Sequence, residues 1–416
     1  MRISISIALV VTATIVSANA QSGQPTPPQT RIVVTSAIPS TPNQIRSTPL
    51  PTPVPTQKLP VTSPMTNQPS QASNISHKGL SFSQIKQRVA EAKRHLTARP
   101  LTIASVEPVL FTSLIRVAFL DSNTKQIDSY VLTKDQFLAH GLASLAITTS
   151  GKQIVSRTIR GNGVNTPVVV TDMNGQVHLP LVVQYPRENR GVMTEMAYYI
   201  STHPGLITPE VVGAGKMYVR NTIDLAREQL RQKGYPIMPK IADLAERLAT
   251  VEHVDHLRFR TEFHPNIYND IFTLYALNEG DTYRFSVSSA GAGGMVQMIP
   301  STYRMVRSLF PNAALHPDFV QGMRNHVNAS EAMLLYMQMT WNDLIASPTV
   351  SNALATGIAS PEHLMAAGYN SNPAKLPGYI NRGGANWRTL IPRETKIYLQ
   401  IWDSLERAVQ QPARRQ

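Results

Sequence analysis

The sequence predicts an α+β protein in which a small antiparallel β domain is followed by a mostly α-helical domain. Between about residues 103 and 185, β-branched runs alternate with turn signals such as Asn174-Gly175, which is typical of short strands joined by tight turns. From about residue 201 onward, apolar residues recur at helical spacing, and prolines stand where first helical turns would begin.

The first twenty residues have the features of a secretory signal. Arg2 supplies a positive charge, residues 5–16 form a short apolar run, and Ala18-Asn19-Ala20 offers small residues for cleavage. The apolar run is too short to span a bilayer. We therefore expect residues 1–20 to be removed on export, and the mature protein to be periplasmic or secreted without a transmembrane segment.

Residues 21–78 are predicted to be a disordered linker. Prolines crowd between residues 25 and 70, together with Thr, Ser and Gln and with few charges. Such a composition cannot bury enough apolar area to offset the entropy lost on ordering. The segment is expected to tether the domains that follow it.

Residues 79–200 form the predicted β-rich accessory domain. A helix is expected first, from Ser81 to Leu96, and the strands follow it. The expected strands are 109–120, 127–132, 153–159, 167–170 and 177–184. No catalytic arrangement of residues is recognisable in this domain, and the sequence assigns it no role.

Residues 201–416 form the predicted α-helical domain. Three expected helices, 209–232, 239–257 and 265–278, each begin at a proline. The other expected helices are 301–309, 329–345, 361–367 and 395–409. A short irregular stretch at residues 278–300 interrupts this helical pattern.

Charge and composition narrow the classes of ligand. A net charge of +13 attracts polyanions, and in an exported protein it favours cell-wall polymers or phospholipid headgroups over nucleic acid, since the basic residues are dispersed. The chain has no cysteine, so disulfides and thiolate zinc sites are excluded. His253, His256 and His264 match no zinc spacing, and Val296 stands at the third glycine position of the dinucleotide pattern. We therefore expect no metal and no cofactor.

The irregular stretch carries the candidate catalytic residue, Glu279. It stands at the predicted end of a helix, where Gly280 can supply the left-handed conformation that stops the helix. Eleven residues after Glu279 comes Ala290-Gly291-Ala292, followed by Gly294-Met295-Val296-Gln297 and Pro300. Two further motifs lie in later helices: Ala367-Gly368-Tyr369-Asn370 and Glu394-Thr395-Lys396-Ile397-Tyr398.

This order of motifs resembles that of the soluble lytic transglycosylases, a goose-lysozyme-like family that cleaves peptidoglycan. The resemblance covers residues 265–405, about a third of the chain. It implies a lysozyme-like catalytic domain that acts on peptidoglycan glycan strands. The implied reaction is lytic cleavage of the MurNAc-β-1,4-GlcNAc bond, in which the sugar's own 6-hydroxyl attacks and leaves a 1,6-anhydro-MurNAc end.

By this resemblance Glu279 is the acid and base of the reaction, and Tyr398 orients it. A helix C-terminus and apolar walls would both raise the pKa of such a carboxyl, as a proton donor requires. Met295 is expected to line the cleft. The substrate-binding residues that the resemblance implies are Met295, Gln297, Tyr369, Asn370 and Tyr398.

Two other glutamates are rival candidates for the acid. Glu252 and Glu262 each stand in suitable sequence, but neither keeps the family's short distance to the Ala290-Gly291-Ala292 loop, so Glu279 ranks first. The chain also departs from the family pattern, with Gly280 where Ser is usual and Gly368 where Ala is usual.

Two alternative functions stay open at this stage. The same cleft could hydrolyse the glycan, as in goose-type lysozyme. The domain could also bind peptidoglycan without cutting it, as a scaffold within an envelope-spanning secretion or conjugation apparatus.

Overall fold

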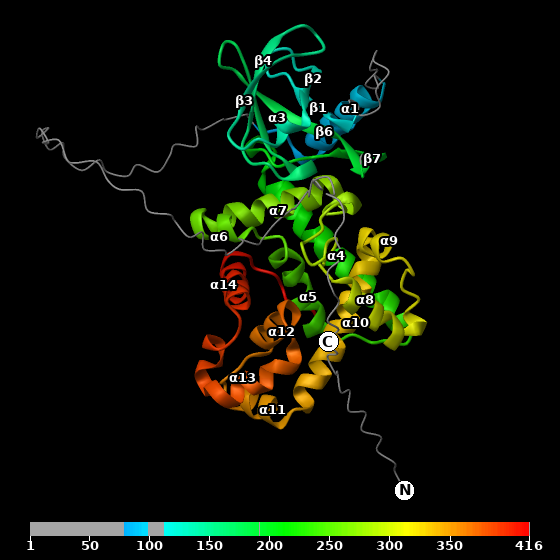
Figure 1. Cartoon of the computed structure of the whole chain (residues 1–416), viewed down its shortest axis with the longest axis vertical. Helices are drawn as coiled ribbons and strands as arrows, with labels where there is room; N and C mark the ends of the chain where they lie inside the picture. Colours follow the sequence, from blue (N-terminus) through cyan, green and yellow to red (C-terminus); the bar gives the residue numbers. More distant parts are fainter. Residues whose placement is uncertain (1–78, 99–111, 191, 416) are drawn as a thin grey trace, which may run out of the picture. The chain divides into compact units, whose positions relative to one another are not determined.

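The computed structural model describes residues 79–98, 112–190 and 192–415. The predicted signal and linker, residues 1–20 and 21–78, lie outside this described part. Figure 1 shows a β-sheet followed along the chain by a series of helices, which confirms the α+β class.

The strands form an antiparallel sheet in the order β2-β1-β6-β5-β4-β3, and β7 pairs with β6. Their bounds are β1 Leu114–Leu120, β2 Ile127–Thr133, β3 Ala143–Ile147, β4 Gln153–Thr158, β5 Val168–Asp172, β6 Val177–Asn189 and β7 Val192–Tyr199. The sequence predicted strands at five of these places and missed β3 and β7. The start of the expected strand 109–120 lies partly outside the described residues, and β1 begins at Leu114.

The two ends of this strand order meet. Tyr130 in β2 bridges to Thr148 just after β3, and the N–H of Thr149 donates to the carbonyl of Ser129 at 2.7 Å. The sheet therefore curls on itself, which lets one of its faces enclose a core.

Alternation along β1 explains why this strand contributes to two cores. Ile115, Val117 and Phe119 point into the core enclosed by the sheet, whereas Ala118 and Leu120 point to the opposite face. On that face lies helix α1, Phe82–Ala98. Its buried residues are Ile85, Val89, Ala92 and Leu96. They recur at helical spacing, so one stripe of the helix covers the sheet.

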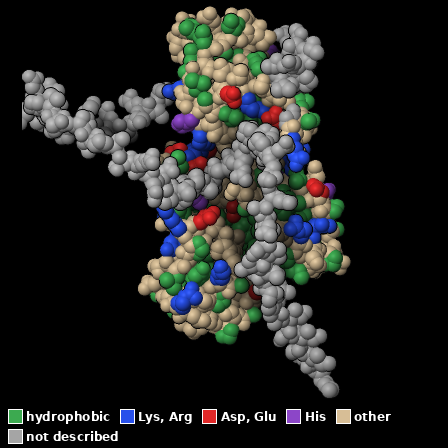
Figure 2. Space-filling model, viewed as in Figure 1, with side chains coloured by type: hydrophobic (Ala, Val, Ile, Leu, Met, Phe, Trp, Pro, Cys, Tyr) green, Lys and Arg blue, Asp and Glu red, His purple; other side chains and the backbone are tan. Residues whose placement is uncertain are grey.

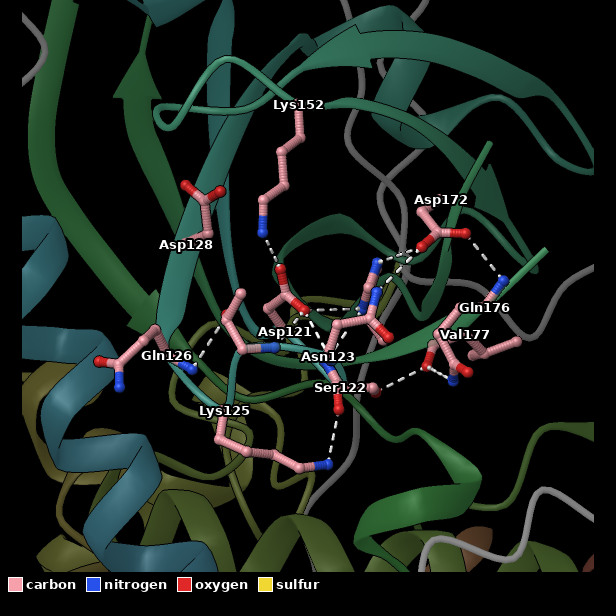
Figure 3. A network of polar contacts seen from close by, with 12 residues as sticks. Asp121, Ser122, Asn123, Lys125, Gln126, Asp128, Lys152, Asp172, Gln176 and Val177 are labelled. Carbon is pink, nitrogen blue, oxygen red and sulfur yellow. Dashed lines mark hydrogen bonds and ion pairs between the residues drawn. The ribbon is translucent and has the colours of Figure 1, made fainter. Parts of the chain in front are cut away.

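A polar network joins three turns of the sheet (Figure 3). Buried Asp121 accepts hydrogen bonds from the backbone of Asn123 and pairs with Lys152, while Asn123 donates to Asp172 at 3.1 Å. Burial alone would raise the pKa of Asp121, but the hydrogen bonds from Lys152 and the backbone lower it to about 2. These residues come from the turns after β1, β3 and β5, so the network fixes those turns to one another.

The helices of the following segment are bounded as follows: α4 Pro209–Gln232, α5 Pro239–Val251, α6 His256–Thr261, α7 His264–Asn278, α8 Pro300–Leu309, α9 Phe319–Arg324, α10 His326–Ala346, α11 Pro348–Ala355, α12 Pro361–Asn370, α13 Leu376–Gly383 and α14 Arg393–Ala408. Short 3-10 turns stand at Gly163–Asn165, Pro204–Leu206, Glu279–Asp281, Pro311–Ala313, Pro373–Lys375 and Gly384–Thr389, and helix α3, Lys134–Leu138, follows β2. Proline stands in the first turn of α4, α5, α7, α8, α11 and α12, as the sequence predicted for the first three.

One predicted helix is divided in the structure. The expected helix 239–257 ends as α5 at Val251, and α6 begins at His256. Asp255 causes the new start, because its carboxylate accepts hydrogen bonds from the backbone N–H groups of Leu257 and Arg258. The break places Glu252 at a helix C-terminus.

The helices pack around one large apolar core, which includes α4, α5, α7, α10, α12 and α14. Helices α4 and α7 approach closely at Gly215, where an added Cβ would lie 1.9 Å from the carbonyl oxygen of Phe272. Among the residues that the structure describes, no helix combines the length and apolar character needed to cross a bilayer. Figure 2 shows Lys and Arg side chains spread over the visible face among acidic ones, as the dispersed basic sequence predicts.

Candidate active site

Glu279 lies at the end of α7, as predicted, but its surroundings are polar. Its own backbone, not that of Gly280, takes the positive φ of 47° that ends the helix. Its side chain is 54% exposed, and its Oε1 accepts a hydrogen bond from Lys86 Nζ at 2.7 Å. Solvent and an ammonium group therefore surround this carboxylate, where apolar walls were expected.

The tyrosine expected to orient Glu279 contacts a different carboxyl. The hydroxyl of Tyr398, on α14, donates to Oε1 of Glu252 at 2.5 Å. Tyr398 is 3% exposed, so this hydrogen bond is made in a poorly solvated place. Glu252 follows the last residue of α5, and its N–H still bonds the carbonyl of Leu248. The structure thus brings Tyr398 together with Glu252, one of the two rivals, and not with Glu279.

The surroundings of Glu252 favour a protonated carboxyl. Burial raises its pKa to about 8, although the hydrogen bond from Tyr398 acts in the opposite direction. The charge of Glu394 raises it further. The C-terminal end of the α5 dipole disfavours negative charge in the same way. At neutral pH most of the molecules therefore carry a proton on Glu252.

A second tyrosine, near this carboxyl, is hydrogen-bonded to the glycine-rich loop. Tyr369, near the end of α12, donates its hydroxyl proton to the carbonyl of Val296 at 2.7 Å. Burial raises the pKa of Tyr369 well above its ordinary value, and the nearby Glu252 charge adds to the increase. Both Tyr369 and Tyr398 therefore stay neutral hydroxyl donors, and both lie close to Glu252.

His253 ties the loop to the end of α5. Its Nε2 lies 2.9 Å from the carbonyl oxygen of Met295, and its ring stacks on Tyr283 at a centroid distance of 3.4 Å. Burial lowers the pKa of His253 to about 3, so the ring is neutral and Nε2 carries the proton that it donates. The residue after Glu252 thus holds the backbone of the predicted substrate-binding motif.

The loop itself requires glycine at position 294. Its φ is 67°, and a Cβ there would lie 2.3 Å from the carbonyl oxygen of Met323. Gln297 also has a positive φ, of 46°, and its amide donates to the carbonyl of Gly294 at 2.8 Å and to Ser286 Oγ at 3.2 Å. These bonds hold the half-buried Gln297 side chain close to its own loop.

Met295 and Asn370, two of the predicted substrate-binding residues, differ in burial. The side chain of Met295 is fully buried in the core, so it does not line a cleft surface, and only its backbone contributes to the site. Asn370 is half-buried at the C-terminal end of α12, directly after Tyr369. Gly368 in the same motif faces Pro373, whose Cβ would lie 3.1 Å from an added Cβ, which explains glycine in place of the usual alanine.

Glu262 and His264 have structural partners. Glu262 is held by Arg258 at 2.7 Å, and Arg258 also pairs with Asp270. His264 contacts Ser404 and the carbonyl of Phe259. Within residues 79–98, 112–190 and 192–415, no group of three or more His, Asp or Glu side chains is arranged to hold a metal ion.

The site is therefore a half-buried carboxyl at a helix end, with two neutral tyrosines and a tight glycine loop beside it. No protein-family model, curated protein or solved structure matches this chain. The class that the structure defines is an α+β protein.

A sequence signal for Glu252 did exist. Asp255 followed by a second helical run indicates a new helix start, and a break there would have placed Glu252 at the end of its helix.

Proposed function

We propose that the protein is a peptidoglycan lytic transglycosylase with a lysozyme-like helical domain, in which Glu252 replaces Glu279 as the acid and base. The observation that carries the proposal is the contact of Tyr398 with Glu252, a carboxyl whose pKa burial raises to about 8. A general acid must be protonated at working pH and able to give its proton up, and Glu252 meets both conditions.

The motifs behind the resemblance support this assignment once Glu252 is taken as the acid. Tyr398 of the α14 motif contacts Glu252 at 2.5 Å, and His253 beside it contacts the carbonyl of Met295 in the loop at 2.9 Å. Tyr369 of the α12 motif contacts the carbonyl of Val296 in the same loop at 2.7 Å. With Glu252 as the acid, the distance along the chain from the acid to the loop is longer than in the family pattern, because α6 and α7 lie between them.

The proposed reaction moves two protons through one carboxyl. Protonated Glu252 gives its proton to the glycosidic oxygen as the bond from that oxygen to C1 breaks. The resulting carboxylate takes the proton of the 6-hydroxyl on the same sugar, whose oxygen bonds to C1 and closes the 1,6-anhydro ring. No water is consumed, and Glu252 ends protonated as it began. Intramolecular attack of this kind profits from a high effective concentration.

The neighbouring tyrosine has a defined part in this cycle. Tyr398 donates to Glu252 Oε1, so it stabilises the carboxylate formed midway and holds its orientation. The charge of Glu394 and burial oppose the carboxylate, which favours its return to the protonated form. The carboxyl is thus balanced between its two states.

Hydrolysis is the second candidate, and Glu394 is the observation that favours it. Glu394 is exposed and close enough for its charge to raise the pKa of Glu252. A second carboxylate of this kind could activate water in an inverting mechanism. The same experiment distinguishes the two reactions.

Purified sacculi digested with the wild-type protein would be analysed by mass spectrometry of the released fragments, with Glu252→Gln as the control. Lytic cleavage predicts 1,6-anhydro ends that are absent from the control digest. Reducing ends one water heavier would show hydrolysis. Binding without any released fragment would refute both reactions and support the scaffold function.

A further inference from the structure

Three arginines surround one aromatic ring beside the candidate site. Arg187, Arg284 and Arg324 place their guanidinium carbons 4.8, 5.9 and 5.7 Å from the centroid of the Phe285 ring. Arg187 comes from β6, Arg324 from α9, and Arg284 and Phe285 from the segment after α7. We call these four residues the arginine cluster.

The negative charge around the arginine cluster does not balance its positive charge. Glu195 is shared between Arg284 at 3.1 Å and Arg324 at 3.6 Å, and the more exposed Asp281 lies 3.6 Å from Arg284. Arg187 has no ion pair or side-chain hydrogen bond with any other described residue. The three guanidinium groups therefore have only two carboxylates beside them, those of Glu195 and the largely exposed Asp281.

The cluster also has hydrogen-bonding capacity that the protein leaves unused. The Nε atoms of Arg284 and Arg324 are buried and have no hydrogen-bond partner among the described residues. Leaving donors of charged groups unpaired away from water is costly. Burial and the neighbouring Arg324 lower the pKa of Arg187 from its ordinary value, which reflects the same unfavourable surroundings. A bound anion would compensate the excess positive charge of the cluster.

The cluster is connected to the catalytic loop through a few residues. Tyr283 stacks on His253, which follows Glu252, and two residues later Phe285 stands within the cluster. The next residue, Ser286, accepts a hydrogen bond from Gln297. A substrate held at Glu252 and Gln297 could therefore extend a side branch to these arginines.

We propose that the arginine cluster binds a carboxylate of the peptide carried by the glycan strand, so that the protein prefers peptide-bearing peptidoglycan. This inference rests on the proposed function. In a peptide-bearing strand the lactyl carboxyl of muramic acid is taken up in the amide bond to the peptide, so the carboxylates lie along the peptide, away from the sugar ring. In a stripped strand the lactyl carboxylate is free, but it lies directly beside the ring and does not reach as far as a peptide branch. Planar guanidinium groups match planar carboxylates through paired N–H donors, and the guanidinium N–H donors of Arg187 make no hydrogen bond or ion pair with another residue in the described part of the chain.

The test measures binding of purified glycan strands to the Glu252→Gln protein, which cannot turn them over. Peptide-bearing strands and strands stripped of peptide are compared, with and without Arg187→Gln. We expect the parent to prefer peptide-bearing strands by roughly ten- to a hundredfold, the range for a hydrogen bond to a charged group. Arg187→Gln should remove that preference and leave the affinity for stripped strands unchanged.

Arg157→Gln is the matched control, because it removes the same charge from an exposed position on β4. It should keep the preference. Thermal unfolding of Arg187→Gln should match the parent, since no ion pair is lost.

The inference is overturned if the parent shows no preference, or if Arg187→Gln retains it. Competition by inorganic phosphate but not by acetate would identify a phosphate site and also overturn the carboxylate assignment. If wild-type protein cleaves both kinds of strand equally, the inference alone fails. If it neither binds nor cleaves either kind, the proposed function fails.

Discussion

Replacing Tyr398 by phenylalanine removes the hydrogen bond that holds Glu252 and leaves the aromatic packing in place. That bond lowers the pKa of Glu252, so its loss must raise the pKa. A hydrogen bond to a charged group is worth about 1.5–3 kcal/mol, and one pKa unit corresponds to about 1.4 kcal/mol. The expected increase is therefore about 1–2 units, starting from about 8.

The assay is the dependence of kcat/KM on pH, with soluble glycan strands as substrate. Activity should fall as pH rises through the pKa of the acid, so the wild-type alkaline limb should lie near 8. In Tyr398→Phe this limb should move to higher pH, and kcat should fall because the carboxyl is no longer oriented.

The control is Tyr268→Phe, which removes another buried hydroxyl that donates to the carbonyl of Ile401 and not to a carboxyl. It should leave the limb in place. An alkaline limb that stays fixed in Tyr398→Phe, or that moves to lower pH, would refute the assignment of this limb to Glu252.

Three further outcomes follow from the same contacts. Because the folded-state pKa of Glu252 is raised from 4.5 to about 8, the wild type loses stability as pH rises between these values. Glu252→Gln should therefore match the wild type in urea unfolding near pH 4 and exceed it above pH 8 by at most about 5 kcal/mol. Gly294→Ala should lower the free energy of unfolding by roughly 2–4 kcal/mol, because the new Cβ strains the backbone and collides with the carbonyl oxygen of Met323. Gly357 has a similar φ of 71° but open space around it, so Gly357→Ala should lower the free energy of unfolding by only about 1 kcal/mol in the same assay. Lys86→Met should change the free energy of unfolding by less than about 1 kcal/mol and leave cleavage intact, because its pair with Glu279 is half exposed; a large loss of activity would return Glu279 to the site.

Much of the fold could be predicted from local patterns. Pro209 to Gln232 was predicted residue for residue, because a proline in the first turn and a long apolar stripe leave little ambiguity. Strand β3 was missed because it is short, and its outward residues Leu145 and Ile147 are apolar and exposed, so the strand lacks the usual alternation.

The sequence singled out the motifs of the candidate site, but the structure pairs Tyr398 with a glutamate other than the expected Glu279. The loop at 290–297 and the motifs containing Tyr369 and Tyr398 were singled out from sequence, and contacts in the structure join them. Spacing along the chain favours Glu279 as the acid, whereas the structure pairs Tyr398 with Glu252 and places Glu279 in solvent beside Lys86. The break before α6 ends α5 at Val251, so Glu252 stands at a helix end, where it meets Tyr398. Spacing along the chain does not reveal such a contact.

Met295 shows the same limit on a smaller scale. A methionine in a glycine-rich loop has the composition of a cleft wall, yet its side chain is fully buried while its carbonyl accepts from His253. Which atoms of a loop face the ligand depends on backbone torsions, such as the positive φ at Gly294 and Gln297. Such torsions are not encoded in residue type alone.

The most direct measurement is turnover of soluble glycan strands by Glu252→Gln and Glu279→Gln, side by side, with strand affinity measured for each. We predict that Glu252→Gln lowers kcat by about 10²–10⁴-fold at nearly unchanged affinity, the range for loss of a general acid. Glu279→Gln should keep kcat within about twofold of the wild type, as expected for an exposed residue. Full activity in Glu252→Gln, or its loss only in Glu279→Gln, would contradict the assignment.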